Sequence, residues 1–134
     1  MKTLNRAGLP MGAFLLLTGI GHFVFPAPLD EIVPSFIPGD PRFWTYISGV
    51  AEIAIGLGLI APAAIRIANQ SLNYWSAVSA FWLYVLVYPA NINMAIMWWD
   101  RPMPEPVYAL ARLPLQLLLF MWAWKLKKKF EANK

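Results

Sequence analysis

Four long apolar stretches, separated by polar or proline-rich segments, dominate the pattern of hydrophobic and polar positions along the chain. They cover residues 8–25, 43–61, 73–98 and 106–124. A helix needs roughly 17 to 25 residues to cross the hydrocarbon core of a bilayer, so each stretch predicts a transmembrane helix. We therefore expect an all-α fold, a polytopic membrane protein in which residues 1–134 form a single four-transmembrane-helix bundle.

Prolines mark where these helices should end. The segment PAPLDEIVPSFIPGDPR follows the first stretch and carries five prolines, and the segment DRPMPEP before the fourth stretch carries three. Neither segment can continue a helix, because proline lacks the backbone N–H and clashes with the preceding turn. Apolar residues stand between the charges of the first segment, which predicts a Pro-rich interfacial first loop that caps the bundle. A simple exposed turn is the alternative.

Composition and charge agree with lipid as the solvent, because 59% of the residues are hydrophobic and only 13% are charged. Lysine and arginine in short loops are retained on the cytoplasmic side of a membrane. Eight of them flank the same ends of the four stretches, namely Lys2, Arg6, Arg66, Lys125, Lys127, Lys128, Lys129 and Lys134. We expect an integral protein of the plasma (inner) membrane with both termini cytoplasmic, in which the final lysines anchor to lipid headgroups and bind no nucleic acid.

Polar residues interrupt all four apolar stretches at similar depth. Counted at roughly 1.5 Å per helical residue, five of them lie between the outer interface and the midplane. These five are His22, Glu52, Asn91, Arg112 and Gln116. Pro89 and Pro114 fall in the same layer, where helix-breaking residues are tolerated around a cavity. The pattern predicts a ligand cavity in the outer half, bounded by these five residues and Tyr88; a tight core without space is the alternative.

Glu52 stands in the middle of the apolar segment SGVAEIAIGLGLIA and needs a partner there. A lone charge at the bilayer centre costs about 2.5 to 3.5 kcal/mol on insertion scales. Arg112 is the strongly basic residue at comparable depth, so we expect an interior ion pair between Glu52 and Arg112. In the alternative, Glu52 is protonated and hydrogen-bonds across a helix contact, while Arg112 extends outward to the headgroups.

Several short motifs together resemble the DoxX-like family of small membrane proteins. They are GIGHFVFP, IVPSFIP, SGVAEIAIGLGL, YPANINMA and RLPLQLLLFMWA, which occur in this order over most of the chain. The resemblance implies a four-helix transmembrane bundle and an oxidoreductase-associated subunit with quinone as electron acceptor. It also marks the positions His22, Glu52, Asn91, Arg112 and Gln116 as the family's polar residues.

Three functions compete on this basis. The first is an accessory subunit of a quinone-linked oxidoreductase system, which binds an amphipathic ligand and pairs with a membrane or redox protein. The second is a non-catalytic assembly factor or scaffold, and the third a proton-coupled carrier that uses Glu52. The sequence contains no complete catalytic constellation. With no cysteine and one histidine, we expect no metal and no covalent cofactor. A second copy of the chain is a further possible partner.

Overall fold

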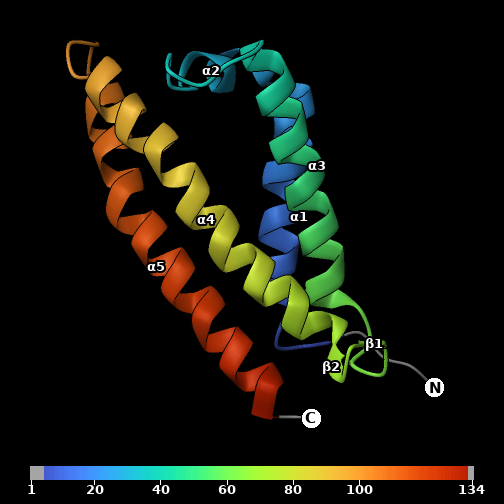
Figure 1. Cartoon of the computed structure of the whole chain (residues 1–134). Coiled ribbons are helices and arrows are strands. Elements are labelled where there is room, and N and C mark those ends of the chain that lie inside the picture. The colour runs from blue at the N-terminus through green and yellow to red at the C-terminus, as the bar shows by residue number, and fades with distance from the viewer. Residues whose placement is uncertain (1–4, 133–134) are drawn as a thin grey trace.

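A computed structural model describes residues 5–132, which form mostly helices (Figure 1). The long helices are α1 (Leu9–Val24), α3 (Pro41–Ile60), α4 (Leu72–Met97) and α5 (Glu105–Ala132). The first three begin and end within two residues of the stretches that the hydrophobic pattern predicts. The sequence pattern therefore locates these helices, while the segments between them hold more structure than expected.

Two of the segments that connect the long helices contain regular structure. The first forms a short helix, α2 (Pro26–Glu31), which has a proline in its first turn, where no N–H is needed. The second forms an antiparallel pair of two-residue strands, β1 (Arg66–Ile67) and β2 (Gln70–Ser71). Ala68 and Asn69 at its turn both have positive φ, as the tight turn of a hairpin requires.

Helix α5 continues eight residues beyond the predicted end at residue 124. Its last turns bury Leu126 and Phe130, which lie four residues apart and so share one helix face. On a neighbouring face Lys127 Nζ lies 3.2 Å from Glu131 Oε2. The basic stretch is therefore a packed part of the helix, which extends beyond the predicted apolar span 106–124.

Three helices, α3, α4 and α5, are long and apolar enough to cross a membrane. Helix α1 is equally apolar in character but has 16 residues, just short of the roughly 17 to 25 that a span needs. The structure thus supports a membrane protein with three candidate spans and a shorter apolar helix beside them.

The long helices pack as two antiparallel hairpins (Figure 1). The first hairpin consists of α1 and α3, the second of α4 and α5. They meet at the end that holds the β-strands and the last turns of α5, the basic end, and separate toward the α2 end. A core of side chains from all four long helices fills the basic end, formed by Met11, Leu15, Leu59, Ala77, Ala80, Tyr84, Ala123, Leu126 and Phe130. This core is the main direct contact between the hairpins.

Glycine pairs bring the backbones of α1 and α3 into contact. A methyl group at Gly12 would lie 2.8 Å from the Gly56 carbonyl oxygen, and one at Gly56 would lie 2.8 Å from the Gly12 oxygen. Gly19 and Gly49 repeat the arrangement at 2.9 and 3.0 Å. Both pairs are seven residues apart on each helix, so they lie on one face of it. Small residues at such positions permit the close approach that favours helix association in lipid.

Asn73 joins the two hairpins at the basic end. Its fully buried Nδ2 lies 3.0, 3.1 and 2.8 Å from the carbonyl oxygens of Gly58, Leu59 and Ala61. The last carbonyls of a helix have no partner within the helix, and buried ones must find a donor elsewhere. Asn73, in the first turn of α4, therefore caps the end of α3.

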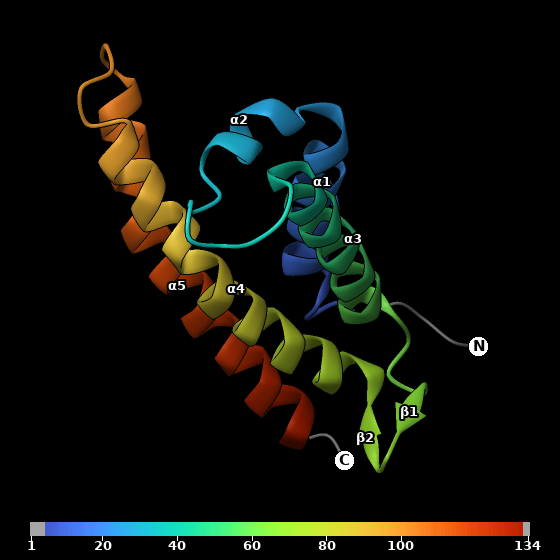
Figure 2. The ribbon, with the colours of Figure 1, turned by 45° about the horizontal axis from the view of Figure 1, so that its top comes forward.

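Helix α2 and Ile32, which we call the α2 bridge, connect the hairpins at the other end (Figure 2). Asp30 accepts hydrogen bonds from Thr45 Oγ1 at 2.6 Å and from Arg42 Nε at 2.7 Å, both on the first hairpin. Burial would raise the pKa of Asp30, but these two hydrogen bonds and the Arg42 charge together hold the pKa below its usual value. Asp30 therefore stays charged at neutral pH and fixes the bridge to α3.

The other side of the α2 bridge contacts the second hairpin. The Ile32 side chain packs with Met94, Ala95, Trp98 and Ala109 in a small apolar cluster. The Ile32 carbonyl oxygen accepts a hydrogen bond from Asn93 Nδ2 at 3.0 Å, and Glu31 forms an ion pair with Arg101. The Pro-rich segment thus spans the α2 ends of both hairpins.

The glycine contacts give a direct test of the first hairpin. We expect Gly12→Ala and Gly56→Ala each to destabilise the protein by about 1 to 3 kcal/mol, because each methyl group would force the backbones apart. Gly21→Ala on α1 is the matched control, since a methyl group there meets no atom within 4 Å. Thermal unfolding in detergent followed by circular dichroism measures the effect, and equal stability of all three variants would contradict the close contact.

Candidate functional site

Glu52 lies in a buried polar network with two residues of α1. Its Oε2 is 3.0 Å from His22 Nε2, and its Oε1 accepts a hydrogen bond from Thr18 Oγ1 at 2.6 Å. The His22 and Glu52 side chains are only 16% and 12% exposed. Both carboxylate oxygens therefore have a partner on the adjacent helix, and Glu52 is satisfied within the first hairpin.

The contacts of His22 limit where the protons of the pair can be. His22 Nδ1 lies 2.6 Å from the Thr18 carbonyl oxygen, which can only accept, so Nδ1 carries a proton. Nε2 and Glu52 Oε2, 3.0 Å apart, would repel each other with no hydrogen between them. One proton must lie between these atoms, either on His22 or on Glu52. The pair can therefore donate or accept a proton at this contact.

The local sequence explains why these side chains meet. Thr18 and His22 are four residues apart on α1, so they lie on one face, one turn apart. On α3, Gly49 leaves the space that His22 needs, because a methyl group at Gly49 would lie 2.8 Å from His22 Cβ. The glycine contact between the helices and the polar network thus depend on each other.

The second hairpin carries a separate group of buried polar residues. Gln116 on α5 donates from Nε2 to the Tyr84 carbonyl oxygen on α4 at 2.9 Å. Tyr84 and Asn91 are 5% and 1% exposed and lie seven residues apart on one face of α4. Within residues 5–132 neither the Tyr84 hydroxyl nor Asn91 Oδ1 has a hydrogen-bond partner. Buried polar atoms usually have one, so these two atoms keep hydrogen-bonding capacity that the described side chains do not use.

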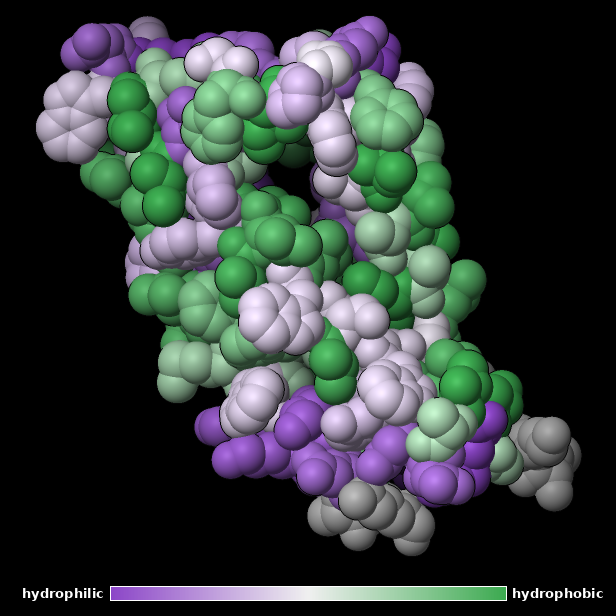
Figure 3. Space-filling model, viewed as in Figure 1, coloured by the Kyte–Doolittle hydropathy of each residue, from purple (hydrophilic) through white to green (hydrophobic). Residues whose placement is uncertain are grey.

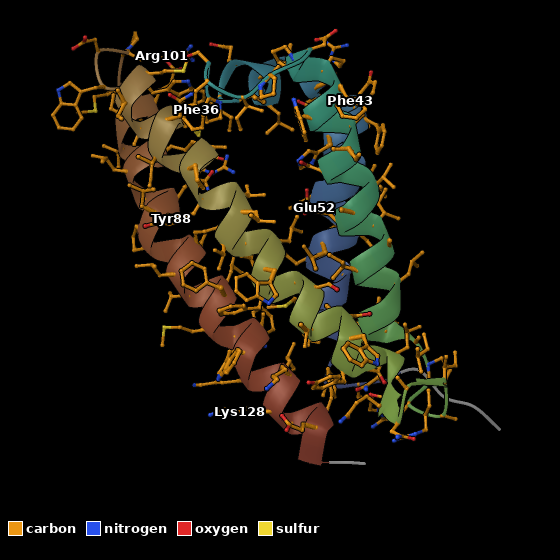
Figure 4. All side chains as sticks on the ribbon, viewed as in Figure 1. Phe36, Phe43, Glu52, Tyr88, Arg101 and Lys128 are labelled. Carbon is orange, nitrogen blue, oxygen red and sulfur yellow. The ribbon has the colours of Figure 1, made fainter. Side chains whose placement is uncertain are left out.

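An opening separates the two hairpins below the α2 bridge, and hydrophilic side chains border it on both sides (Figure 3). Glu52 lies beside this opening on the first hairpin (Figure 4). The polar network of the first hairpin therefore lies next to the space between the two hairpins.

The structure contradicts the expected ion pair between Glu52 and Arg112. Among the described residues Glu52 pairs with His22 and forms no ion pair with Arg112. Arg112 Nη1 instead lies 3.4 Å from Tyr108 Oη, and its guanidinium is 5.7 Å from the Tyr108 ring centroid. Arg112 belongs to α5 of the second hairpin, and the two hairpins separate toward the α2 end (Figure 1).

The six residues predicted to bound one cavity thus divide into smaller groups. His22 and Glu52 are in direct contact, while Asn91 and Gln116 belong to the second hairpin. Tyr88 turns away from the opening (Figure 4), and its ring packs against Phe120 with centroids 6.1 Å apart. No hydrogen bond or ion pair joins the two groups within the described part of the chain.

Three residues that the structure places in buried or half-buried polar positions are absent from the predicted set. The Thr18 hydroxyl binds Glu52 directly. The unpartnered hydroxyl of Tyr84 depends on burial that the sequence does not give. Asn73 carries a signal that could have been used, a polar residue in the first turn of an apolar helix. Within residues 5–132 no three His, Asp or Glu side chains gather in a possible metal site.

A double-mutant cycle distinguishes the two partners proposed for Glu52. We expect Glu52→Gln and His22→Gln each to lower the free energy of unfolding in detergent by about 1 to 3 kcal/mol, because each leaves a buried polar group without its partner. The double variant should lose clearly less than the sum of the two. The cycle of Glu52→Gln with Arg112→Gln is the control and should be additive within about 0.5 kcal/mol. The reverse pattern would contradict the observed pairing.

Comparison with known proteins places the chain in one family. A family model described as a domain of unknown function, DUF8561, matches residues 11–127, which cover most of the four long helices and the whole polar network. No curated protein and no solved structure matches the chain significantly. The match covers most of the chain, and the chain therefore belongs to the DUF8561 family.

Proposed function

We propose that the protein is an integral membrane protein that binds the polar head of an amphipathic molecule, such as a quinone, between its two hairpins. The observation that carries the proposal is the buried pair of His22 and Glu52 beside the opening. The unpartnered hydroxyl of Tyr84 and Asn91 Oδ1 support it, because they offer further hydrogen bonds on the second hairpin. Ligand sites typically combine a mostly apolar wall with a few such polar groups.

In this proposal all four long helices span the plasma (inner) membrane, and both termini are cytoplasmic. Helix α1 packs along α3 through the glycine pairs, so it lies at the same depth as a candidate span. Its 16 residues cover roughly 24 Å, and polar interfacial groups supply the rest of the bilayer thickness. Lys and Arg gather at the basic end, which favours a cytoplasmic position for that end.

The chemistry of the pair suits a quinone in either redox state. A quinone carbonyl accepts a hydrogen bond and a quinol hydroxyl donates one. The single proton between His22 Nε2 and Glu52 Oε2 lets the pair act as donor or acceptor. An apolar tail can pass between the hairpins into lipid, while the α2 bridge covers the head group from the α2 end.

The proposed role is that of an accessory subunit in a quinone-linked oxidoreductase system, as the resemblance to DoxX-like proteins implies. The described side chains offer proton donors and acceptors but no redox group, so electrons would come from a partner membrane or redox protein. The protein's own contribution would be to position the head group and exchange a proton with it.

A second candidate is a scaffold or assembly factor. One observation favours it: both oxygens of Glu52 already have partners within the first hairpin, as a purely structural network would require. In that role the pair fixes the register of α1 against α3. A proton-coupled carrier would use the same pair for proton exchange with a small solute.

Quinone binding can be tested on the purified protein in lipid nanodiscs. We expect a short-chain ubiquinone or menaquinone analogue to raise the melting temperature, because a ligand at 100 times its Kd stabilises the native state by about 2.7 kcal/mol. Glu52→Gln should weaken binding about two- to tenfold, the value of one hydrogen bond. Asp100→Asn removes an exposed acid at the α2 end and should leave binding unchanged.

The same experiment decides between the candidates. The absence of any stabilisation by both analogues would contradict the ligand site and favour the scaffold. Equal weakening by Asp100→Asn and Glu52→Gln would also contradict it, because the effect would then not come from the polar network.

A further inference from the structure

A surface groove of about 310 Å³ lies on α4 and α5, with its two lysines at the basic end. It is lined by Phe81, Phe120, Met121, Trp124, Lys125 and Lys128. We propose that this groove binds one anionic phospholipid, with the phosphate at the two lysines and an acyl chain on the aromatic floor. The proposal is independent of the function proposed for the polar network.

The two lysines that line the groove are the ones available for an anion. Lys127, between them in sequence, is engaged elsewhere: its Nζ contacts Glu131 and lies 4.5 Å from the Trp124 ring centroid. Lys125 and Lys128 are exposed and form no ion pair within residues 5–132. They are three residues apart and so share one helix face. Lys128 extends from α5 at the basic end (Figure 4).

The floor of the groove is apolar and leads from the lysines toward the middle of α5. Phe81 on α4 packs against Trp124 and Phe120, with ring centroids 5.1 and 6.1 Å apart. Met121 is 55% exposed beside them. Positive charge at one end and an apolar path at the other match a phospholipid, whose phosphate lies at the interface and whose chain points into the membrane.

The charge distribution favours a lipid over a second copy of the chain. Five of the seven acidic residues lie at the α2 end, either between α1 and α3 or between α4 and the first residue of α5: Asp30, Glu31, Asp40, Asp100 and Glu105. A parallel neighbour in the membrane would bring its own lysines to this groove rather than acids. Anionic headgroups supply the complementary charge at this depth.

Brominated lipids test the site, because bromine on an acyl chain quenches a tryptophan in contact with it. The full-length protein is placed in phosphatidylcholine vesicles that contain a small fraction of brominated phosphatidylglycerol or brominated phosphatidylcholine. The Trp124 signal is the difference between the wild-type protein and Trp124→Phe. We expect the affinity of the groove for brominated phosphatidylglycerol, measured at Trp124, to exceed that for brominated phosphatidylcholine by about fivefold or more. A single basic residue near an anionic lipid raises the affinity by about fivefold.

Lysine variants distinguish specific lipid binding in the groove from general attraction of anionic lipid by surface charge. Replacing Lys125 and Lys128 together by glutamine should bring the preference close to one, whereas Lys129→Gln removes an exposed charge outside the groove and should preserve most of it. Equal quenching of wild-type Trp124 by both lipids would overturn the proposal, whatever the variants do. So would an equal loss in Lys129→Gln, or no quenching by either lipid, which would mean that protein covers the groove.

Discussion

Burial of the Glu52 carboxyl group in an apolar helix is the constraint on which the rest of this structure depends. A carboxylate at that depth must have partners, and α1 supplies both, the Thr18 hydroxyl and the His22 imidazole. These short contacts are reached only because glycine pairs let the α1 and α3 backbones touch. The close packing of α1 against α3 and the hydrogen bonding of the Glu52 carboxyl group therefore depend on each other.

This arrangement explains why the two helices of each hairpin pack tightly, while an opening separates the two hairpins. The first hairpin satisfies its own charge, so it needs no polar partner from α4 or α5 at the level of Glu52. The hairpins are held together instead by the core at the basic end and by the α2 bridge at the other. Between these two attachments the opening remains (Figure 3), and on α4 the buried polar atoms of Tyr84 and Asn91 have no partner among the described residues.

The sequence predicts the helices well because long apolar runs and prolines act locally, along a single segment. It also identifies Glu52 and His22, since polar residues in such runs are conspicuous. It assigns Glu52 the wrong partner, because depth gives the position along the membrane normal but not which helices touch. The α1–α3 contact depends on glycines whose pairing across helices a single sequence does not show. The structure of the α2 bridge rests on contacts such as Asp30 with Thr45, which are equally non-local.

The most direct measurement of the central claim uses the fact that His22 is the only histidine in the chain. Nitrogen-15 NMR of the histidine-labelled protein in lipid gives one pair of ring signals. The account predicts a protonated Nδ1 and an Nε2 in a strong hydrogen bond, whose signal changes in Glu52→Gln and stays the same in Arg112→Gln. A ring that titrates like free imidazole and does not respond to Glu52→Gln would contradict the shared proton.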